Sequence, residues 1–296
     1  MSKINIKHYM LLILIFIIYT LIFSFVVIAQ EKFQDIKIFK DMPYSGIKEE
    51  TSYLNSLDIY VPEKNENCPV IVFVHGGTWV LGDKGKLSDK AVAFTRAGMI
   101  YISINYRLSS EVKHPLHAYD VTRAIVWIYE HISEFGGNPE NIFLLGHSAG
   151  GHLAALITID ERYLGKLGFS SKIIKGVIGL DSAAYHLPTL IKSEPENYFL
   201  FEMAFGDNPE KWEEASPLNY IKKGKDIPPF LLIYAGDREV TKVVNLTFAQ
   251  ALQSSDYQVH LYYAFEKNHV NIEQDLGKAG DEVIKKIFQF IDQYKD

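Results

Sequence analysis

The chain has 296 residues, 48% of them hydrophobic, so it can bury a large core, and one α/β domain is the expected organisation. Its formal net charge of −6 falls to −8 without Lys3 and Lys7 of an N-terminal stretch that holds no Asp or Glu, and this acidic balance argues against nucleic acid as a partner. The single cysteine, Cys68, excludes an intrachain disulfide and a cysteine-based metal cluster.

Residues 9–29 form an uncharged, almost wholly apolar stretch that follows the two lysines. A basic start before an apolar run predicts an export signal, and the small residue Ala29 suits a signal-peptidase site. About 20 apolar residues could equally span a bilayer as an uncleaved anchor, so signal peptide and membrane anchor both stay open for residues 1–29. In either case we expect residues 30–296 to be exported, to the periplasm or the outside of the cell, or to be held at the membrane.

Apolar strands alternate with helices through the rest of the chain. Residues 30–50 predict an arm that leads to an edge strand, and residues 57–61 alternate and end at Pro62, as an outer strand should. Further strands are expected at 69–74, 98–104, 142–145, 174–180, 230–234 and 259–265, with helices at 120–135, after 150 and at 277–294. This alternation predicts a mostly parallel, doubly covered sheet, whose ligands bind beyond the carboxyl ends of the strands.

Residues 146–150, Gly-His-Ser-Ala-Gly, match the pattern G-x-S-x-G between an expected strand and an expected helix. In that setting a sharp, strained turn exposes the serine hydroxyl, and the flanking glycines keep side chains out of the turn. The pattern therefore predicts Ser148 as a nucleophile. We expect His147 to line the turn and His152 to pack within the following helix.

A serine nucleophile needs a histidine base and a carboxylate that orients the imidazole. His269 directly follows the last expected strand and is the best-placed base. Asp237 follows the strand at 230–234, and the order Ser148, Asp237, His269 suits this arrangement. Glu239 is the first alternative for the acid, and Asp181 follows the preceding strand.

The oxyanion of a tetrahedral intermediate needs backbone N–H donors. Ala149, the residue after the nucleophile, supplies one. Gly76 and Gly77, in a loop after the strand at 69–74, carry no side chains to block the others, and Trp79 is expected to pack beneath that loop. No metal and no organic cofactor is expected.

Together these motifs resemble the α/β-hydrolase superfamily, in particular its esterase branch with His-Gly-Gly-x-Trp and Gly-His-Ser-Ala-Gly-Gly-His, which is similar to kynurenine formamidases. The resemblance covers residue 50 to the end and also includes residues 105–108, 114–115, 120, 136–139, 216–218 and 268–269. It implies an α/β-hydrolase fold and a serine carboxylesterase activity. The oxyanion motif has Thr78 where many lipase relatives have a third glycine.

Residues 183–220 interrupt the strand rhythm and are rich in aromatic side chains. An insertion at this place predicts a small lid or an acyl pocket over the active edge. Its expected pocket residues are Tyr185, Phe205 and Trp212, together with Trp79 from the glycine loop.

The expected activity is hydrolysis of a small-molecule carboxylic ester through an acyl-enzyme on Ser148. Hydrolysis of an amide or an aryl formamide would use the same groups, because a protonated His269 can also assist an amine leaving group. A hydrolase fold used only for binding is the third alternative, although such proteins usually lack one of the catalytic residues.

Overall fold

The computed structural model describes residues 12, 14–20, 35–44, 53–85 and 88–296. The chain divides into an N-terminal unit, Met1–Ile36, and a large unit, Lys37–Asp296. Residues 14–20 are helical, whereas most of the expected leader, residues 1–29, lies outside the described residues. Among the residues that are described, no helix is both long enough and apolar enough to cross a membrane.

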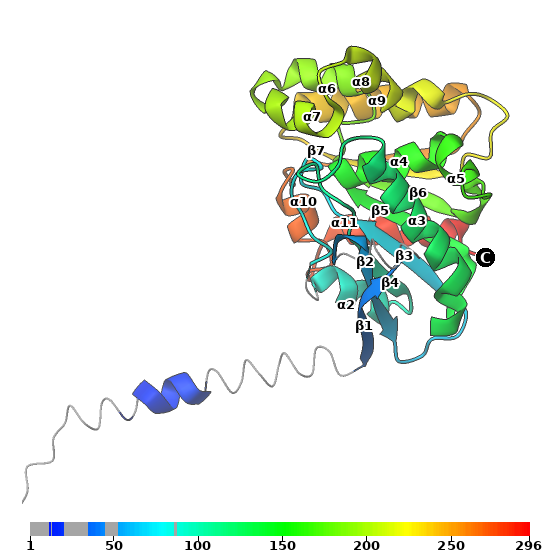
Figure 1. Cartoon of the computed structure of the whole chain (residues 1–296). Coiled ribbons are helices and arrows are strands. Elements are labelled where there is room, and N and C mark those ends of the chain that lie inside the picture. The colour runs from blue at the N-terminus through cyan, green and yellow to red at the C-terminus, as the bar shows by residue number, and fades with distance from the viewer. Residues whose placement is uncertain (1–11, 13, 21–34, 45–52, 86–87) are drawn as a thin grey trace, which may run out of the picture. The chain divides into compact units, whose positions relative to one another are not determined.

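The large unit is built on an eight-stranded sheet with the strand order β1-β2-β4-β3-β5-β6-β7-β8 (Figure 1). The strands are β1 (Ile36–Pro43), β2 (Ser56–Pro62), β3 (Cys68–Val74), β4 (Ile100–Ile104), β5 (Gly137–His147), β6 (Gly176–Leu180), β7 (Phe230–Ala235) and β8 (Val259–Ala264). Neighbours from β4 to β8 run parallel, and β2 is antiparallel to β4. The expected mostly parallel sheet is confirmed.

The expectation that residues 57–61 form an outer strand is wrong. All seven residues of β2 are buried, and β1 lies outside it as the edge strand. The polar residue that produced the alternating pattern, Asp58, is buried because its carboxylate pairs with the ammonium group of Lys84. A buried charge is tolerated when it is paired, so the alternation did not mark a solvent-exposed face.

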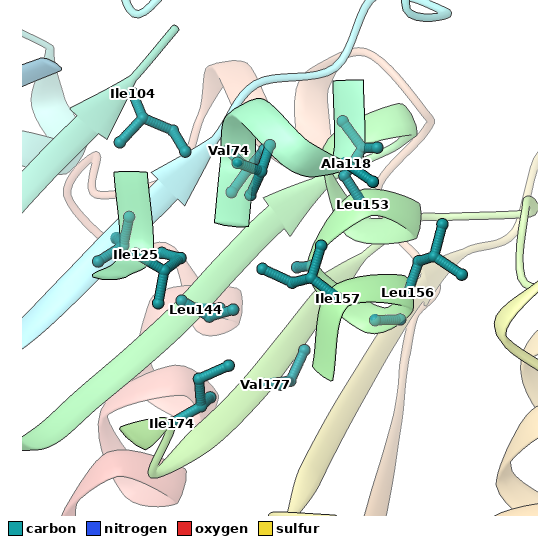
Figure 2. Close-up of a cluster of buried hydrophobic side chains, with 14 of the residues drawn as sticks. Val74, Ile104, Ala118, Ile125, Leu144, Leu153, Leu156, Ile157, Ile174 and Val177 are labelled. Atoms are coloured by element: carbon teal, nitrogen blue, oxygen red, sulfur yellow. The ribbon is translucent and has the colours of Figure 1, made fainter. Parts of the chain in front are cut away.

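Helices cover both faces of the sheet. Successive side chains of a strand point to opposite sides, so the apolar side chains on each face need a layer of helices to bury them. Val74 and Leu144 face the helices α3 (Leu116–His131) and α4 (Ala149–Ile159) in a cluster of buried apolar side chains (Figure 2). The opposite face meets α2 (Asp89–Arg96) and α11 (Glu282–Tyr294), as the ring contacts of Phe94 with Tyr101 at 5.7 Å and of Phe290 with Phe143 at 6.3 Å show. Burying one such large apolar side chain stabilises the fold by roughly 1.5–3 kcal/mol.

Two of the expected helices have observed bounds that differ from the expected ones. The helix expected at 120–135 begins earlier, at Leu116, and its last part is the 3-10 turn Ile132–Phe135. The closing helix begins at Glu282 and not at 277, because the carboxylate of Asp281 accepts the first free N–H groups of α11. The short helix α10 (Asn271–Gln274) precedes it.

The segment of residues 183–220, here called the cap segment, lies between β6 and β7. It contains the helices α6 (Leu187–Ser193), α7 (Tyr198–Phe205) and α8 (Pro209–Glu214). These helices lie beside α9 (Glu239–Ser254), which follows β7 (Figure 1). Tyr185 anchors the start of the cap segment by stacking on Phe248 of α9 at 4.3 Å.

Candidate active site

Four loops that carry expected site residues leave the sheet at the same edge. Ser148 follows β5, Asp181 follows β6, Asp237 follows β7 and His269 follows β8. These strands are parallel neighbours, so their carboxyl ends lie together. The chain thereby brings residues more than 100 positions apart to one site.

Ser148 has the strained backbone of a nucleophile turn, with φ of 52° and ψ of −118°. The turn is held by the N–H of Ser148, which donates to the carbonyl of Leu180 on the neighbouring strand at 3.0 Å. It also depends on the two glycines of the motif. A Cβ atom on Gly146 would lie 2.4 Å from the backbone of Gly150, and one on Gly150 would lie 2.0 Å from the carbonyl oxygen of Val74.

The imidazole of His269 is held by a buried carboxylate. Its Nδ1 lies 2.6 Å from Oδ2 of Asp181, and the other oxygen of Asp181 accepts the N–H of Ala235 at 2.7 Å. Burial raises the pKa of the Asp181 carboxyl, but the hydrogen bonds from His269 and Ala235 outweigh it, so the pKa lies below its usual value. Asp181 is therefore an anion, which favours a proton on Nδ1 and a free lone pair on Nε2.

The structure corrects the expectation about which carboxylate the imidazole meets. Asp237 does not contact the ring; its Oδ2 accepts the backbone N–H of His269 at 3.1 Å. Glu239 starts α9 and is exposed, with its carboxylate 3.8 Å from Lys242. Asp181 also satisfies the chain order serine, acid, histidine. In the sequence, the feature that sets Asp181 apart from Asp237 is that it comes directly after the last residue of its strand, β6.

A cation lies next to the same imidazole. Nη1 of Arg238 is 3.1 Å from Nδ1 of His269, and its Nη2 pairs with the carboxylate of Glu194 from the cap segment. Nδ1 offers one hydrogen-bonding position, and the shorter contact with the buried Asp181 takes it. Arg238 is thus a neighbouring positive charge that the carboxylate of Glu194 offsets. The sequence did not predict either residue as part of the site.

His147 supports the loop that carries the base. Its Nε2–H donates to the carbonyl of His269 at 2.9 Å, and the two rings are 4.9 Å apart. Desolvation, together with the neighbouring His269, lowers the pKa of His147 to about 3, so its ring is neutral at neutral pH. His147 lines the turn as expected, and it also connects the nucleophile turn to the His269 loop.

The expected oxyanion donors lie around Ser148. Ala149 is the first residue of α4, so the helix itself leaves its N–H free, and it lines the same cavity as Gly77. Gly77 has φ of 108°, and a Cβ atom there would lie 2.2 Å from the carbonyl oxygen of Leu81. Gly76 packs directly on the nucleophile, since its Cβ would lie 3.1 Å from Cβ of Ser148.

A cavity of about 500 Å³ opens over the nucleophile. Its lining includes Ser148, Ala149, Gly77 and His269, together with Trp79. The cap segment contributes mostly apolar and acidic residues to this lining: Ala183, Ala184, Leu190, Glu194, Glu196, Leu200 and Phe201. Arg238 also lines the cavity, whose volume is in the range of small-molecule sites.

Three of the four expected pocket residues lie elsewhere. Tyr185 is buried against Phe248, and Phe205 is buried with its ring 4.7 Å from Trp79. Trp212 is half-buried and donates its indole N–H to the carbonyl of Gly206 at 2.9 Å within the cap segment. Aromatic content located the cap segment, but it did not tell which rings face the cavity and which pack behind it.

Comparison with known proteins agrees with this architecture. The family model BD-FAE matches residues 57–255. Esterase LipQ of Mycobacterium tuberculosis is 30% identical over 73% of this chain and 52% of its own length. Isoprenylcysteine alpha-carbonyl methylesterase ICME of Arabidopsis thaliana is 29% identical over 80% of this chain and 59% of its own length. The chain thus spans between about half and three fifths of these curated relatives.

Solved structures show the same fold. A truncated carbohydrate esterase from gut microbiota superposes with a TM-score of 0.71 at 19% identity, over 87% of this chain and 96% of that one. Esterase B of Lactobacillus rhamnosis does so with a TM-score of 0.69 at 18% identity, over 94% and 93%. These likenesses establish the α/β-hydrolase fold.

Proposed function

This chain belongs to the BD-FAE family of α/β-hydrolases, and from that premise we propose that it is a serine carboxylesterase that cleaves small esters through an acyl-enzyme on Ser148. The observation that carries the proposal is that Ser148 and His269 line one cavity while Asp181 holds the imidazole of His269. The curated relatives named above as an esterase and a methylesterase support the reaction class.

In the proposed acylation step, Nε2 of His269 takes the proton of the Ser148 hydroxyl as Oγ attacks the ester carbonyl. The carboxylate of Asp181 keeps the proton of the imidazole on Nδ1 and stabilises the imidazolium that forms. His269 then gives its proton from Nε2 to the departing alkoxide. A water molecule, activated by the same imidazole, hydrolyses the acyl-enzyme and restores Ser148.

The oxyanion of each tetrahedral intermediate would be held by the backbone N–H groups of Ala149 and the Gly76–Gly77 loop. Removing one donor of this kind typically costs about 10²–10³-fold in kcat. A positive φ and the lack of space for a Cβ atom hold Gly77 in the conformation that this loop needs.

The cavity favours small substrates. Short apolar groups can rest on Trp79, Leu190 and Phe201, whereas the charged pair of Arg238 and Glu194 bounds the cavity beside the base. We therefore expect acetyl and butyryl esters to be hydrolysed faster than octanoyl esters.

The test is turnover of p-nitrophenyl acetate, butyrate and octanoate by residues 30–296 and by the Ser148→Ala variant. The native protein should release p-nitrophenol, and the variant should be slower by about 10⁴-fold or more. An alkyl phosphonate should add one adduct to the native protein, located on Ser148 by peptide mass. A folded native protein that is inert to esters and phosphonates would refute the proposal; activity on an N-formyl aryl amine alone would move it to the formamidase class.

We also propose that residues 1–29 carry the chain out of the cytoplasm, on the strength of their basic start and apolar run. Cell fractionation of the full chain and of residues 30–296 tests this. The full chain should be found in the membrane or periplasmic fraction and the shortened chain in the cytosol. Recovery of the full chain from the cytosol would contradict the proposal.

A further inference from the structure

We infer that His152 is a positioning residue for the oxyanion hole, acting through the indole of Trp79. The inference rests on the proposed function, because it concerns how the donors of that same site are held. The residues involved are the glycine loop that ends in Trp79, the helix α4 that carries His152, and the cap segment.

His152 and Trp79 form a hydrogen bond with a defined direction. An indole N–H can only donate, so Nε1 of Trp79 donates to Nδ1 of His152, at 3.2 Å. A carbonyl can only accept, so Nε2–H of His152 donates to the carbonyl of Ala215 at 2.7 Å. Both ring nitrogens are used, and the ring is a neutral imidazole with its proton on Nε2. Both side chains are almost completely buried.

The backbone that Trp79 anchors is strained. Gly77, Thr78 and Trp79 all have positive φ, at 108°, 51° and 61°. Side-chain-bearing residues such as Thr78 and Trp79 rarely adopt this conformation, and such a conformation persists only when its surroundings hold it. A hydrogen bond that fixes Trp79, at the end of this strained segment, therefore determines where the N–H groups of the loop point.

Several contacts hold Trp79, and the bond to His152 is the one that reaches the nucleophile. The carbonyl of Trp79 accepts the N–H and the hydroxyl of Ser109 at 2.8 and 3.0 Å. His152 lies one helical turn after Ser148, and its N–H donates to the Ser148 carbonyl at 3.2 Å. This hydrogen bond thus joins the two halves of the oxyanion hole, the glycine loop and the start of α4, in addition to the direct packing of Gly76 on Ser148.

The same imidazole reaches the cap segment. Ala215 belongs to that segment, and the ring of Trp79 meets Phe205 and Phe201 of α7 at 4.7 and 6.4 Å. A shift of the cap segment would be passed to the glycine loop through His152 and Trp79. His152 does not line the cavity, so we describe it as a positioning residue and not as a catalytic one.

The first test is Trp79→Phe in residues 30–296, assayed with p-nitrophenyl acetate and with an alkyl phosphonate. The change keeps a ring but removes the indole N–H. Because a misplacement of about 1 Å can cost about 10²-fold, we expect kcat and the phosphonylation rate to fall about 10- to 100-fold, with KM changed less than about threefold. The matched control is Trp212→Phe, which removes an indole N–H bonded to Gly206 within the cap segment and should leave kcat within about twofold of the native value.

The second test uses His152 itself. Gln at this position can accept from Trp79 and donate to Ala215, whereas Leu can do neither. We expect His152→Gln to keep kcat within about threefold of the native value and His152→Leu to lose about tenfold or more. This pair decides the inference if Trp79→Phe does not fold, and Trp79→Phe decides it if His152→Leu does not.

The outcomes separate the alternatives. If Trp79→Phe melts earlier but keeps its kcat, or if only KM rises, Trp79 and His152 merely pack or line the pocket and the inference is overturned. Equal kcat for the Gln and Leu variants overturns it as well. If the native protein is inert to both the ester and the phosphonate, the proposed function fails, which is a distinct result.

Discussion

The Asp181 carboxylate meets Nδ1 of His269 at 2.6 Å, although 88 positions separate the two residues in the chain. Asp181 directly follows β6 and His269 lies past β8, with β7 between them in the sheet. The backbone N–H of Ala235, at the end of β7, holds the other carboxylate oxygen. The orientation of the imidazole is therefore set by three parallel strands together.

Replacement of Asp181 tests this arrangement. Asp181→Asn keeps the size of the side chain but removes the charge that favours the proton on Nδ1, so kcat for p-nitrophenyl acetate should fall by about 10³–10⁴-fold. Asp237→Asn changes the carboxylate that accepts the backbone N–H of His269, and its kcat should fall by less than about tenfold. The kcat of Glu239→Gln should be unchanged. A greater loss for Asp237→Asn than for Asp181→Asn would return the role of the acid to Asp237.

The nucleophile turn depends on the absence of a side chain at Gly150. Gly150→Ala would place Cβ 2.0 Å from a backbone oxygen of β3, so we expect a loss of about 3 kcal/mol in the free energy of unfolding. Gly165→Ala is the control, because its Cβ meets nothing within 4 Å in a helical segment; it should gain up to about 1 kcal/mol. Urea unfolding measures both, and equal stability of the two variants would refute the steric argument.

The pair of Glu194 and Arg238 should influence substrate choice. Glu194→Gln removes the carboxylate that pairs with Arg238 and leaves a cation beside the cavity. Esters whose acyl group carries a carboxylate should then gain about fivefold in kcat/KM relative to neutral esters, corresponding to about 1 kcal/mol for a partly exposed pair. Glu196→Gln, an exposed residue of the same cavity, should leave this ratio unchanged. The same ratio in both variants would show that Glu194 does not mask Arg238.

Five histidines with lowered pKa values should make stability depend on pH. Burial lowers the pKa of His75 and His152 to about 4 and that of His114, His117 and His147 to about 3. The unfolded chain takes up these protons near pH 6.5 while the folded chain does not, so it binds more protons between about pH 6.5 and 4. Stability is therefore full above about pH 7 and falls as the pH is lowered, by up to about 1.4 kcal/mol per pH unit for each histidine.

Urea unfolding between pH 7.5 and 5 measures this slope. His114 is the best single probe, because neither ring nitrogen has a hydrogen-bond partner among the described residues and the ring packs against Phe205. His114→Leu removes one of the groups that take up a proton on unfolding, so the free energy of unfolding should fall less steeply as the pH is lowered. At pH 7.5 the variant should be nearly as stable as the native protein. A native protein whose stability is flat over this range would contradict the argument.

Local patterns in the sequence were sufficient for much of this protein. Continuous apolar runs predicted the parallel strands, because a strand that is buried on both faces needs apolar residues at every position. The motif at residues 146–150 placed Ser148 on a turn whose strain and glycine requirement are local properties. His269 and the glycine loop followed from their positions directly after strands, since parallel strands bring their carboxyl ends to one edge.

Only the tertiary structure decided which groups meet across that edge. Asp181 and Asp237 both follow strands, and the choice between them depends on how far each loop extends and on which oxygen meets the N–H of Ala235 or of His269. In the same way, aromatic content located the cap segment, whereas packing turned Phe201 to the cavity and buried Tyr185 behind it. The packing of many elements fixes such contacts to within about 1 Å. The hydrophobic pattern of a single segment does not contain that information.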